Sequence, residues 1–292
     1  MRTYFTGVFL ILLSAFGFGM MPILALFAYQ DGINVPTLLF LRFFLASACL
    51  FAYTLLSRID WSITPRQLFY LFFMGGVLYT FQSAFYFSSV KFIPASLAAL
   101  ILYLYPVLVA TLAVIVDKEK LSGKIIAPAI LALAGLAIVL GAPMDNLNFY
   151  GVALAFGAAV IYSVYIILGR RVVAQVSPVV TTAFIAAFAA ISFLAYGWVG
   201  DVLQFNFSPH AWFIILGVVL FSTILAMATF FAGMNIIGPT RASILSTIEP
   251  VITFGFSALL LGEKLSWIQG IGAAFVLLGA VWVIGQRNAE AA

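Results

Sequence analysis

The chain has 292 residues, of which 65% are hydrophobic and only 8% are charged. Soluble domains carry roughly a quarter charged residues, so this composition excludes a soluble protein and indicates an integral membrane protein. The net charge of +4 does not indicate a nucleic acid partner, because the basic residues lie between apolar segments and form no patch. A single cysteine, Cys49, and a single histidine, His210, leave no ligand set for a metal, and no cofactor is expected.

Ten apolar segments follow one another along the chain, and each is long enough to cross a hydrocarbon core of about 30 Å as a helix. Short polar or helix-breaking connections such as QDGIN, SRIDWSITPR and FNFSP separate them. The expected fold is therefore all-α and integral to the membrane, with ten transmembrane helices and no extramembrane domain. The predicted spans cover residues 5–28, 36–57, 67–89, 94–116, 124–142, 149–168, 179–199, 211–233, 239–261 and 267–285.

The chain repeats itself at an offset of 144 residues: the EKL at 119–121 falls on the EKL at 263–265, and Pro106 falls on Pro250. A single ungapped offset that serves both ends of the unit predicts two five-helix repeats within one integrated membrane domain. Because each unit holds an odd number of spans, the second must enter the membrane from the opposite side, as in the inverted repeats of many secondary transporters. The two predicted repeats cover residues 1–142 and 149–292.

Lysine and arginine predict the orientation, because they are enriched on the cytoplasmic side of membrane proteins. With the N-terminus in the cytoplasm, ten basic residues lie at or near that side, Lys91 and Lys264 lie outside, and Arg42 lies within the second span. We therefore expect both termini in the cytoplasm of a bacterial inner membrane. The ten residues expected on the cytoplasmic side are Arg2, Arg58, Arg66, Lys118, Lys120, Lys124, Arg170, Arg171, Arg241 and Arg287.

The two stretches YPVLVATLAVIVDKEKL and EPVITFGFSALLLGEKL, each followed by a glycine-bearing last helix, resemble the two halves of an EamA-type protein. EamA-type proteins are the ten-helix branch of the drug/metabolite transporter superfamily. The resemblance covers essentially the whole chain, although the first half has DKEKL where the second has GEKL. It implies export or exchange of a small metabolite without implying which one.

The ninth span carries a polar stripe that begins the search for a site. Treated as one helix at 100° per residue, it gathers its polar residues on one half of the wheel and apolar residues on the other. Such segregation indicates a face toward water or protein, although hydroxyls that join neighbouring helices are the alternative. The candidate site residues on this span are Ser243, Ser246, Thr247 and Glu249.

Polar aromatic residues on three other spans complete the candidate cavity. Tyr79, Gln82, Ser83 and Tyr86 are spaced i, i+3, i+4 and i+7 and share one helical face of the third span. Buried tyrosine and glutamine need partners, which either a polar ligand or neighbouring helices can provide. The fourth span adds Tyr103 and Tyr105, and the sixth adds Tyr162; Tyr165 lies nearer the edge and is interpreted as an interfacial anchor.

Pro106 and Pro250 occupy equivalent places in the two repeats, where each removes a helical hydrogen bond. A static kink and a hinge are both open interpretations. Arg42 is interpreted as snorkelling to the outer interface, with pairing to a carboxylate such as Asp31 as the alternative. The GFG at 17–19 indicates close packing or a bend in the first span rather than a nucleotide site, because no strand precedes it.

These observations favour a secondary transporter that exports a small amphipathic metabolite, most simply an amino acid, by alternating access. The chain has no ATP-binding motif, so a gradient must supply the energy, and protons are a candidate coupling ion. An organic-cation or drug exporter with Glu249 as the counter-charge is the main alternative. A membrane-embedded enzyme would need a catalytic constellation at depth that the sequence lacks, and a scaffold would not need polar stripes in both repeats.

Glu249 lies about ten residues into its span, near the bilayer centre. An ionised carboxylate there costs roughly 2.5–3.5 kcal/mol. We therefore expect Glu249 to be neutral when the site is closed and to ionise when water or a cationic group enters. The alternative is a protonated carboxyl that acts as a structural lock. The substrate, the coupling ion and the oligomeric state are not determined by the sequence.

Overall fold

The structure, a computed structural model, describes residues 2–89, 92–93, 95–118, 123–140, 148–262 and 266–285. Every regular element in these residues is helical. The first half contains α1 (Arg2–Gln30), α2 (Val35–Leu56), α3 (Pro65–Phe72), the π-helical turn η1 (Phe73–Tyr79), α4 (Thr80–Ser89), α5 (Ala95–Leu102), α6 (Tyr105–Asp117) and α7 (Gly123–Leu140). The second half contains α8 (Phe149–Val173), α9 (Pro178–Val199), α10 (Ala211–Val219), the π-helical turn η2 (Leu220–Leu225), α11 (Ala226–Ile237), α12 (Pro239–Leu245), the 3₁₀ turn η3 (Ser246–Ile248), α13 (Glu249–Leu261) and α14 (Trp267–Gly285).

These elements group into ten successive segments that match the ten spans expected from the sequence. Within the described residues, eight segments are long and apolar enough to cross a membrane, and two shorter apolar helices, Tyr105–Val116 and Ile126–Ile138, belong to the fourth and fifth segments. Large apolar side chains such as Phe9, Leu259 and Trp198 are mostly exposed on the outside of the bundle. An apolar exterior of this extent suits contact with lipid, so the protein is a multi-pass membrane protein.

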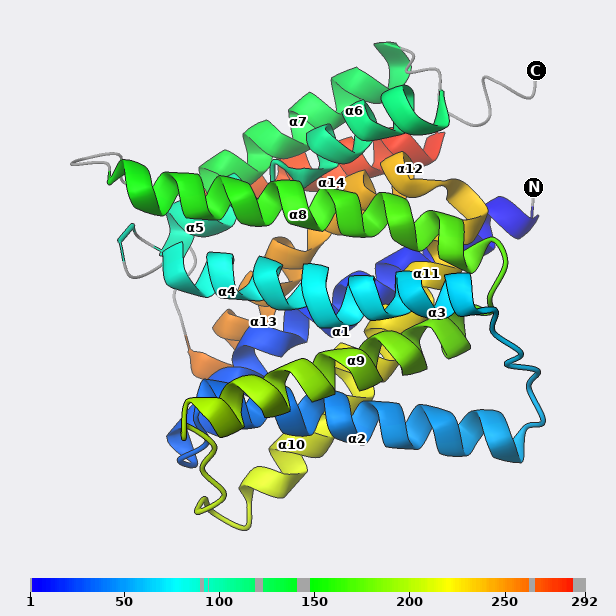
Figure 1. Ribbon diagram of the computed structural model, residues 1–292. Coiled ribbons are helices and arrows are strands. Elements are labelled where there is room, and N and C mark those ends of the chain that lie inside the picture. The colour runs from blue at the N-terminus through cyan, green and yellow to red at the C-terminus, as the bar shows by residue number, and fades with distance from the viewer. Residues whose placement is uncertain are drawn as a thin grey trace.

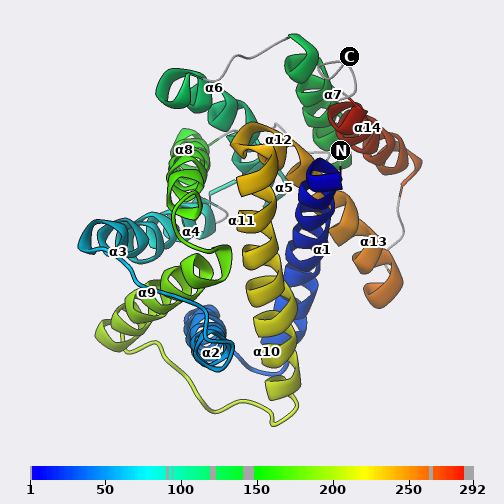
Figure 2. The ribbon, with the colours of Figure 1, turned by 90° about the vertical axis from the view of Figure 1, so that its right-hand side faces the viewer.

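The helices lie side by side in one bundle, with the start of α1 and the end of α14 at the same end of it (Figures 1 and 2). The Tyr4 hydroxyl donates to the carbonyl oxygen of Val283 at 3.3 Å, which joins these two helix ends directly. We call this the terminal end of the bundle and the opposite end the distal end.

The 144-residue offset of the sequence reappears in the helix boundaries. The fourth segment consists of α5 and α6, and the ninth consists of α12 and α13, so both are broken helices at equivalent positions. Even the last residues agree, because Lys118 and Gly262 both end their helices in the left-handed conformation, at φ of 53° and 69°. The breaks differ from the single continuous spans expected over residues 94–116 and 239–261.

Pro106 and Pro250 explain where the broken helices resume. Each proline is the second residue of the new helix, α6 or α13, where its missing N–H leaves no intrahelical bond unmade. The chain turns at Tyr103–Leu104 in the first half and at η3 in the second. Each break thus exposes backbone at mid-depth, which membrane proteins tolerate only where protein or a cavity satisfies it.

Helix pairing follows the repeat. In the bundle α1 packs against α11 while its counterpart α8 packs against α4, and the equivalent helices α2 and α9 pack against each other, as do α7 and α14. Glycine permits the closest approach: a Cβ on Gly17 would lie 2.4 Å from the carbonyl oxygen of Phe221 in η2. The GFG at 17–19 therefore serves close packing, one of the two roles expected from the sequence.

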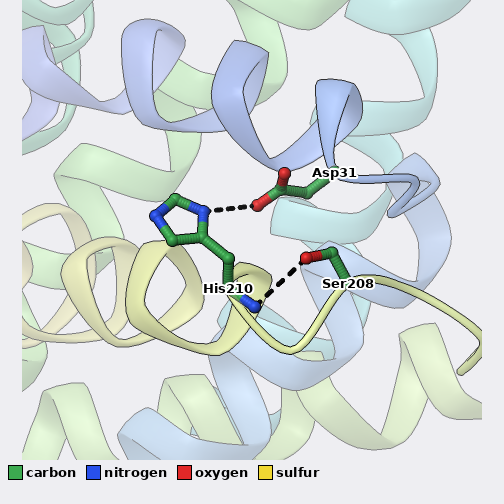
Figure 3. Close-up of polar contacts among 3 residues, drawn as sticks. All are labelled: Asp31, Ser208 and His210. Atoms are coloured by element: carbon green, nitrogen blue, oxygen red, sulfur yellow. Dashed lines mark hydrogen bonds and ion pairs between the residues drawn. The ribbon is translucent and has the colours of Figure 1, made fainter.

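Connections at the distal end are tied together by polar groups. His210 Nδ1 lies 2.8 Å from Asp31 Oδ2, and the His210 N–H donates to the Ser208 hydroxyl at 3.2 Å (Figure 3). Asn34 also fastens this end: it accepts from the Thr37 N–H at the start of α2 and donates to the Val202 carbonyl. The His210 side chain is thus exposed and paired with Asp31.

Candidate functional site: a cavity between the broken helices

A cavity of about 250 Å³ lies in the middle of the bundle and its distal half. Its wall brings together segments from both repeats, including the two broken spans and the two spans that contain π-helical turns. Of the eleven candidate site residues predicted from the sequence, eight line it: Tyr79, Gln82, Ser83, Tyr86, Tyr103, Tyr105, Tyr162 and Glu249. Residues that the sequence did not place here also line it: Phe18, Met21, Pro22, Leu39, Arg42, Leu102, Tyr165, Met227, Phe230, Phe231 and Thr253.

Many lining positions are related by the repeat. Phe18 of α1 corresponds to Tyr162 of α8, and Met21 corresponds to Tyr165, at the offset of 144 residues. The same offset relates Tyr86 to Phe230, and it relates Tyr105 to Glu249. The cavity is therefore built where the two repeats meet, which is where transporters with internal repeats hold their substrates.

A layer of aromatic rings bounds the cavity toward the terminal end. Tyr105 packs edge-on against Tyr162 at 4.8 Å between ring centroids, and Tyr162 stacks on Tyr165 at 5.8 Å. Tyr165 in turn contacts Tyr79 and Phe231, both at 6.0 Å. This layer closes one end of the cavity and offers flat apolar surface with hydroxyl groups at its rim.

Tyr165 corrects an interpretation made from the sequence. Its side chain is only 4% exposed and lies inside the aromatic layer, so it is not an interfacial anchor. Its position along α8 gave the wrong impression, because α8 extends to Val173 and therefore continues past the predicted end of that span at residue 168. Residue 165 is consequently deeper in the bundle than the sequence indicated.

Several polar groups in the wall have no hydrogen-bond partner within the described residues. The hydroxyls of Tyr79, Tyr162 and Tyr165 donate to no described group, yet none is sealed away from the cavity. Gln82 accepts a 3.4 Å hydrogen bond from the Ser83 hydroxyl and donates none. Buried polar groups in proteins are nearly always paired with protein, water or ligand, so these groups suit a ligand with hydrogen-bonding atoms.

Glu249 is the first residue of α13 and points its carboxylate at the cavity. The Tyr103 hydroxyl donates to Glu249 Oε2 at 3.5 Å, a long hydrogen bond that links the breaks of the two repeats. The Tyr105 hydroxyl donates to the Ser243 carbonyl at 3.4 Å and packs α6 on α12 at the terminal side. The N-terminus of a helix carries partial positive charge, so the start of α13 is a favourable position for a carboxylate.

Three polar residues of the ninth span, Ser243, Ser246 and Thr247, do not line the cavity, which corrects the expectation for them. All three are buried, and two of their hydroxyls donate to carbonyls of α12, Ser243 to the Thr240 carbonyl and Thr247 of η3 to the Ile244 carbonyl. The helical wheel failed because it assumed one continuous helix through residues 240–257. The 3₁₀ turn at η3 rotates α13 relative to α12, so one stripe becomes two faces.

Arg42 is a third correction, because it does not snorkel to an interface. Its side chain is 1% exposed and lies in the cavity wall, where Nε donates to Thr223 Oγ1 at 2.7 Å. Asp31, the alternative carboxylate partner, pairs with His210 instead. The sequence signal was present, since an arginine within a span is a functional candidate by default, but its depth could not be judged without the packing of α2 on η2.

No group of metal-ligating side chains occurs among the described residues. A second hollow of about 360 Å³ lies near the terminal end between α3 and α8, lined by residues such as Arg66, Gln67 and Gln175. It involves neither broken span and none of the candidate site residues predicted from the sequence. The central cavity is therefore the candidate site.

Comparison with known proteins agrees with this architecture. The EamA-like transporter family matches residues 5–141 and again residues 149–285. A crystal structure superimposes with a TM-score of 0.76 over 97% of both chains at 24% identity, which shows that the fold is shared.

Three curated relatives are informative. The threonine/homoserine exporter RhtA of Salmonella typhimurium (strain LT2) is 28% identical over 255 residues, 85% of this chain and 81% of that protein. The aromatic amino acid exporter YddG of Ancylobacter novellus is 34% identical over 133 residues, 44% of this chain and 43% of that protein. The uncharacterized transporter YyaM of Bacillus subtilis is 26% identical over 70% of this chain and 68% of that protein. The chain thus spans less than half the length of the YddG relative that it matches.

Proposed function

The chain belongs to the EamA-like transporter family and is a transporter, and from that premise we propose that it exports a small amphipathic metabolite, an α-amino acid. The observation that carries the substrate class is the mixed character of the cavity. Aromatic faces from the tyrosine layer lie beside unpaired hydroxyls, the Gln82 carboxamide and the Glu249 carboxylate. An amino acid has both an apolar side chain and charged groups, so it uses both kinds of wall.

The relatives support the same class of substrate. Two of them carry names that describe amino acid exporters, one for threonine and homoserine and one for aromatic amino acids. Both are distant, and they differ from each other in the size of the side chain they handle. The aromatic layer of this cavity favours the larger, aromatic class.

The proposed mechanism is alternating access of two inverted five-helix repeats. In Figure 1, α1 runs from the terminal end to the distal end while its counterpart α8 runs the other way, which supports the inverted arrangement. The tyrosine layer blocks the terminal side, so transport requires α6 and α12 to separate there while the distal side closes. Pro106 and Pro250, at the starts of α6 and α13, are the proposed hinges.

In the proposed orientation both termini lie in the cytoplasm of a bacterial inner membrane. The ten basic residues that the sequence predicts on the same side as the two termini support this orientation. The cavity would then face outward in this structure. Of these ten, Lys120 and Arg287 lie outside the described residues, as do Lys91 and Lys264.

Glu249 is the proposed coupling group. It is the one acidic residue of the described part of the chain that lines the cavity, and no cation is paired with it there. Loss of its proton to one side and uptake from the other would couple substrate movement to a proton gradient without a cofactor. Facilitated diffusion, with Glu249 as a structural lock, is the competing possibility.

An organic-cation exporter is the second candidate function, and the specific observation that favours it is the same carboxylate at mid-depth. Flux into proteoliposomes separates the two. The purified protein is tested with labelled L-phenylalanine, L-tryptophan, L-threonine and L-homoserine beside tetraphenylphosphonium and 2-phenylethylamine. Uptake of at least one amino acid above protein-free vesicles supports the proposal, while uptake of the cations alone would replace it with the second candidate.

A further inference from the structure

Arg42 makes an unusual set of contacts for a cation inside a membrane bundle. Each of its three guanidinium nitrogens donates once: Nε to Thr223 Oγ1, one terminal nitrogen to the Ser222 carbonyl at 3.1 Å, and the other to Met21 Sδ at 2.7 Å. All three acceptors are uncharged. They hold the guanidinium in place at the cavity wall without neutralising it.

The turn η2 makes this position possible. A π-helical turn leaves a carbonyl outside the regular i→i−4 pattern, and Ser222 directs such a carbonyl at Arg42 while its own hydroxyl donates to the Gly17 carbonyl at 2.8 Å. Thr223 anchors the other side of the guanidinium. Arg42 is therefore held rigidly by α1 and η2, which lowers the conformational cost of binding a ligand.

No carboxylate neutralises Arg42 within the described part of the chain. Asp31 pairs with His210, and the Glu249 carboxylate accepts a hydrogen bond from the Tyr103 hydroxyl. The terminal guanidinium nitrogens retain further N–H groups beyond the bonds they make to protein. A buried charge without an opposite charge is costly, and one that borders a cavity can find its partner in the ligand.

The repeat supplies an internal comparison that speaks against a purely architectural role. The residue equivalent to Arg42 at the offset of 144 is Ala186, on α9. Ala186 is fully buried, and α9 packs against η1 just as α2 packs against η2. The equivalent helix contact is thus made with a methyl group in place of a guanidinium, so the fold does not itself require a cation at this position.

From these observations we propose that Arg42 is the carboxylate-binding residue of the cavity. Resting on the proposed function, this assigns the part of the substrate that Arg42 recognises: the substrate is an amphipathic monocarboxylate, with its carboxylate on Arg42 and its apolar part against the tyrosine layer. A guanidinium suits this role because its planar N–H groups match the two oxygens of a carboxylate. An amine that lacks the carboxylate leaves Arg42 unpaired and is selected against.

The first experiment measures binding to the purified full-length parent and needs no variant. 3-Phenylpropanoate and its uncharged amide, 3-phenylpropanamide, are compared by titration calorimetry in detergent at one pH. They share the ring and chain length and differ in the carboxylate. We expect the acid to bind about tenfold more tightly or better, because hydrogen bonds to charged groups are the strong ones. Equal affinity for the two compounds would overturn the proposal.

The second experiment uses variants. Arg42→Gln should reduce the affinity for 3-phenylpropanoate by about tenfold or more and leave 3-phenylpropanamide unchanged, while Arg42→Lys should retain part of the preference because it keeps the charge. Arg170→Gln is the matched control: Arg170 also donates to an uncharged partner, Asn235 Oδ1, but lies outside the cavity. An architectural role for Arg42 would instead lower thermal stability and leave the ratio of the two affinities intact, and that result would refute carboxylate binding.

Transport distinguishes this failure from a failure of the proposed function. If the parent discriminates the acid from the amide but moves no labelled amino acid, the carboxylate site stands and amino acid export falls. If the parent moves L-phenylalanine and Arg42→Gln moves it equally well, with L-phenylalaninamide competing as strongly as L-phenylalanine, export stands and the assignment of Arg42 falls.

Discussion

The Tyr103 hydroxyl and the Glu249 carboxylate meet at 3.5 Å, although 146 residues of sequence separate them. Tyr103 lies in the break between α5 and α6, and Glu249 begins α13 after the equivalent break. The two interruptions of regular helix thus face each other across the cavity. An ionised carboxylate accepts this hydrogen bond more strongly than a neutral one. The protonation of Glu249 therefore affects how strongly the two breaks are held together.

This relationship yields a prediction for Glu249→Gln. The variant keeps the shape and can still accept from Tyr103, but it cannot ionise. We expect it to fold with a melting temperature close to that of the parent and to lose about tenfold or more of proton-driven transport. The measurement is uptake of labelled amino acid into proteoliposomes with and without an imposed pH gradient, over external pH 5 to about 8.

Counterflow at equal pH on both sides is the control, because exchange needs no net proton movement. Tyr103→Phe removes the hydrogen bond but leaves the carboxyl, so it should alter the pH profile and not abolish the response. If Glu249→Gln transports as well as the parent at every pH, ionisation has no role and Glu249 acts as a structural lock.

A second prediction concerns the cavity wall. Replacing Tyr79, Gln82, Tyr86 or Tyr103 singly by alanine should reduce transport about tenfold while reducing the amount of folded protein much less, because these side chains border a cavity. Tyr53→Ala and Tyr196→Ala are matched controls, since both tyrosines are more than half exposed on the outside of the bundle. Transport is normalised to monodisperse protein recovered by size-exclusion chromatography; equal losses in both groups would argue against a binding role.

The sequence predicted the ten spans well because hydrophobic length and a repeated offset are properties of the chain alone. Predicted and observed boundaries of the second span, 36–57 against Val35–Leu56, differ by a single residue at each end. The sequence also identified eight cavity residues, because polar residues that share one face of a membrane span indicate a face toward water, protein or a ligand. The helical-wheel prediction failed for Ser243 and Thr247, because a wheel is valid only while the helix is continuous. A 3₁₀ turn of three residues leaves no pattern that hydropathy detects.

Arg42 shows a different limit. Its distance from the end of its span allowed either an interface or the interior, and the choice depended on whether an acceptor was available at that depth. The acceptors are the Thr223 hydroxyl and the Ser222 carbonyl, about 180 residues away along the chain. Both residues lie in a π-helical turn that no local sequence pattern predicts. Whether a charged side chain is buried depends on long-range contacts of this kind, and only the structure reveals these contacts.

A third prediction tests the close contact between α1 and η2. Gly17→Ala should destabilise the protein by about 1–3 kcal/mol, because the new methyl group would lie 2.4 Å from the Phe221 carbonyl oxygen and the backbones must separate. Gly255→Ala is the control: its Cβ would meet nothing within 4 Å inside α13, and alanine is the better helix former. In thermal unfolding experiments in detergent, only Gly17→Ala should have a lower melting temperature than the parent.

A fourth prediction separates the two kinds of polar contact at the distal end. His210→Ala should change stability by less than about 1 kcal/mol, because the His210 side chain is 70% exposed and exposed pairs contribute little. Asn34→Ala should cost about 1–2 kcal/mol, since it removes the cap of α2 together with the 2.7 Å bond to the Val202 carbonyl. The free energy of unfolding of each variant is compared with that of the parent, and a larger loss for His210→Ala would contradict this order.

The last prediction concerns topology and uses the repeat directly. Lys118 directly follows α6 and Ser266 directly precedes α14, so the two positions flank equivalent connections of the two repeats, residues 117–120 and 262–264, parts of which lie outside the described residues. The inverted arrangement requires these connections on opposite sides of the membrane. In a Cys49→Ser background, which removes the single native cysteine, Lys118→Cys and Ser266→Cys are each exposed to a membrane-impermeant maleimide in intact bacterial cells and in inside-out vesicles. We expect Ser266→Cys to react in cells and Lys118→Cys to react in the vesicles, because the basic residues favour a cytoplasmic connection after α6. Reversed reactivity would overturn the orientation and keep the inverted repeat, whereas labelling of both positions from one side would refute the inverted repeat itself.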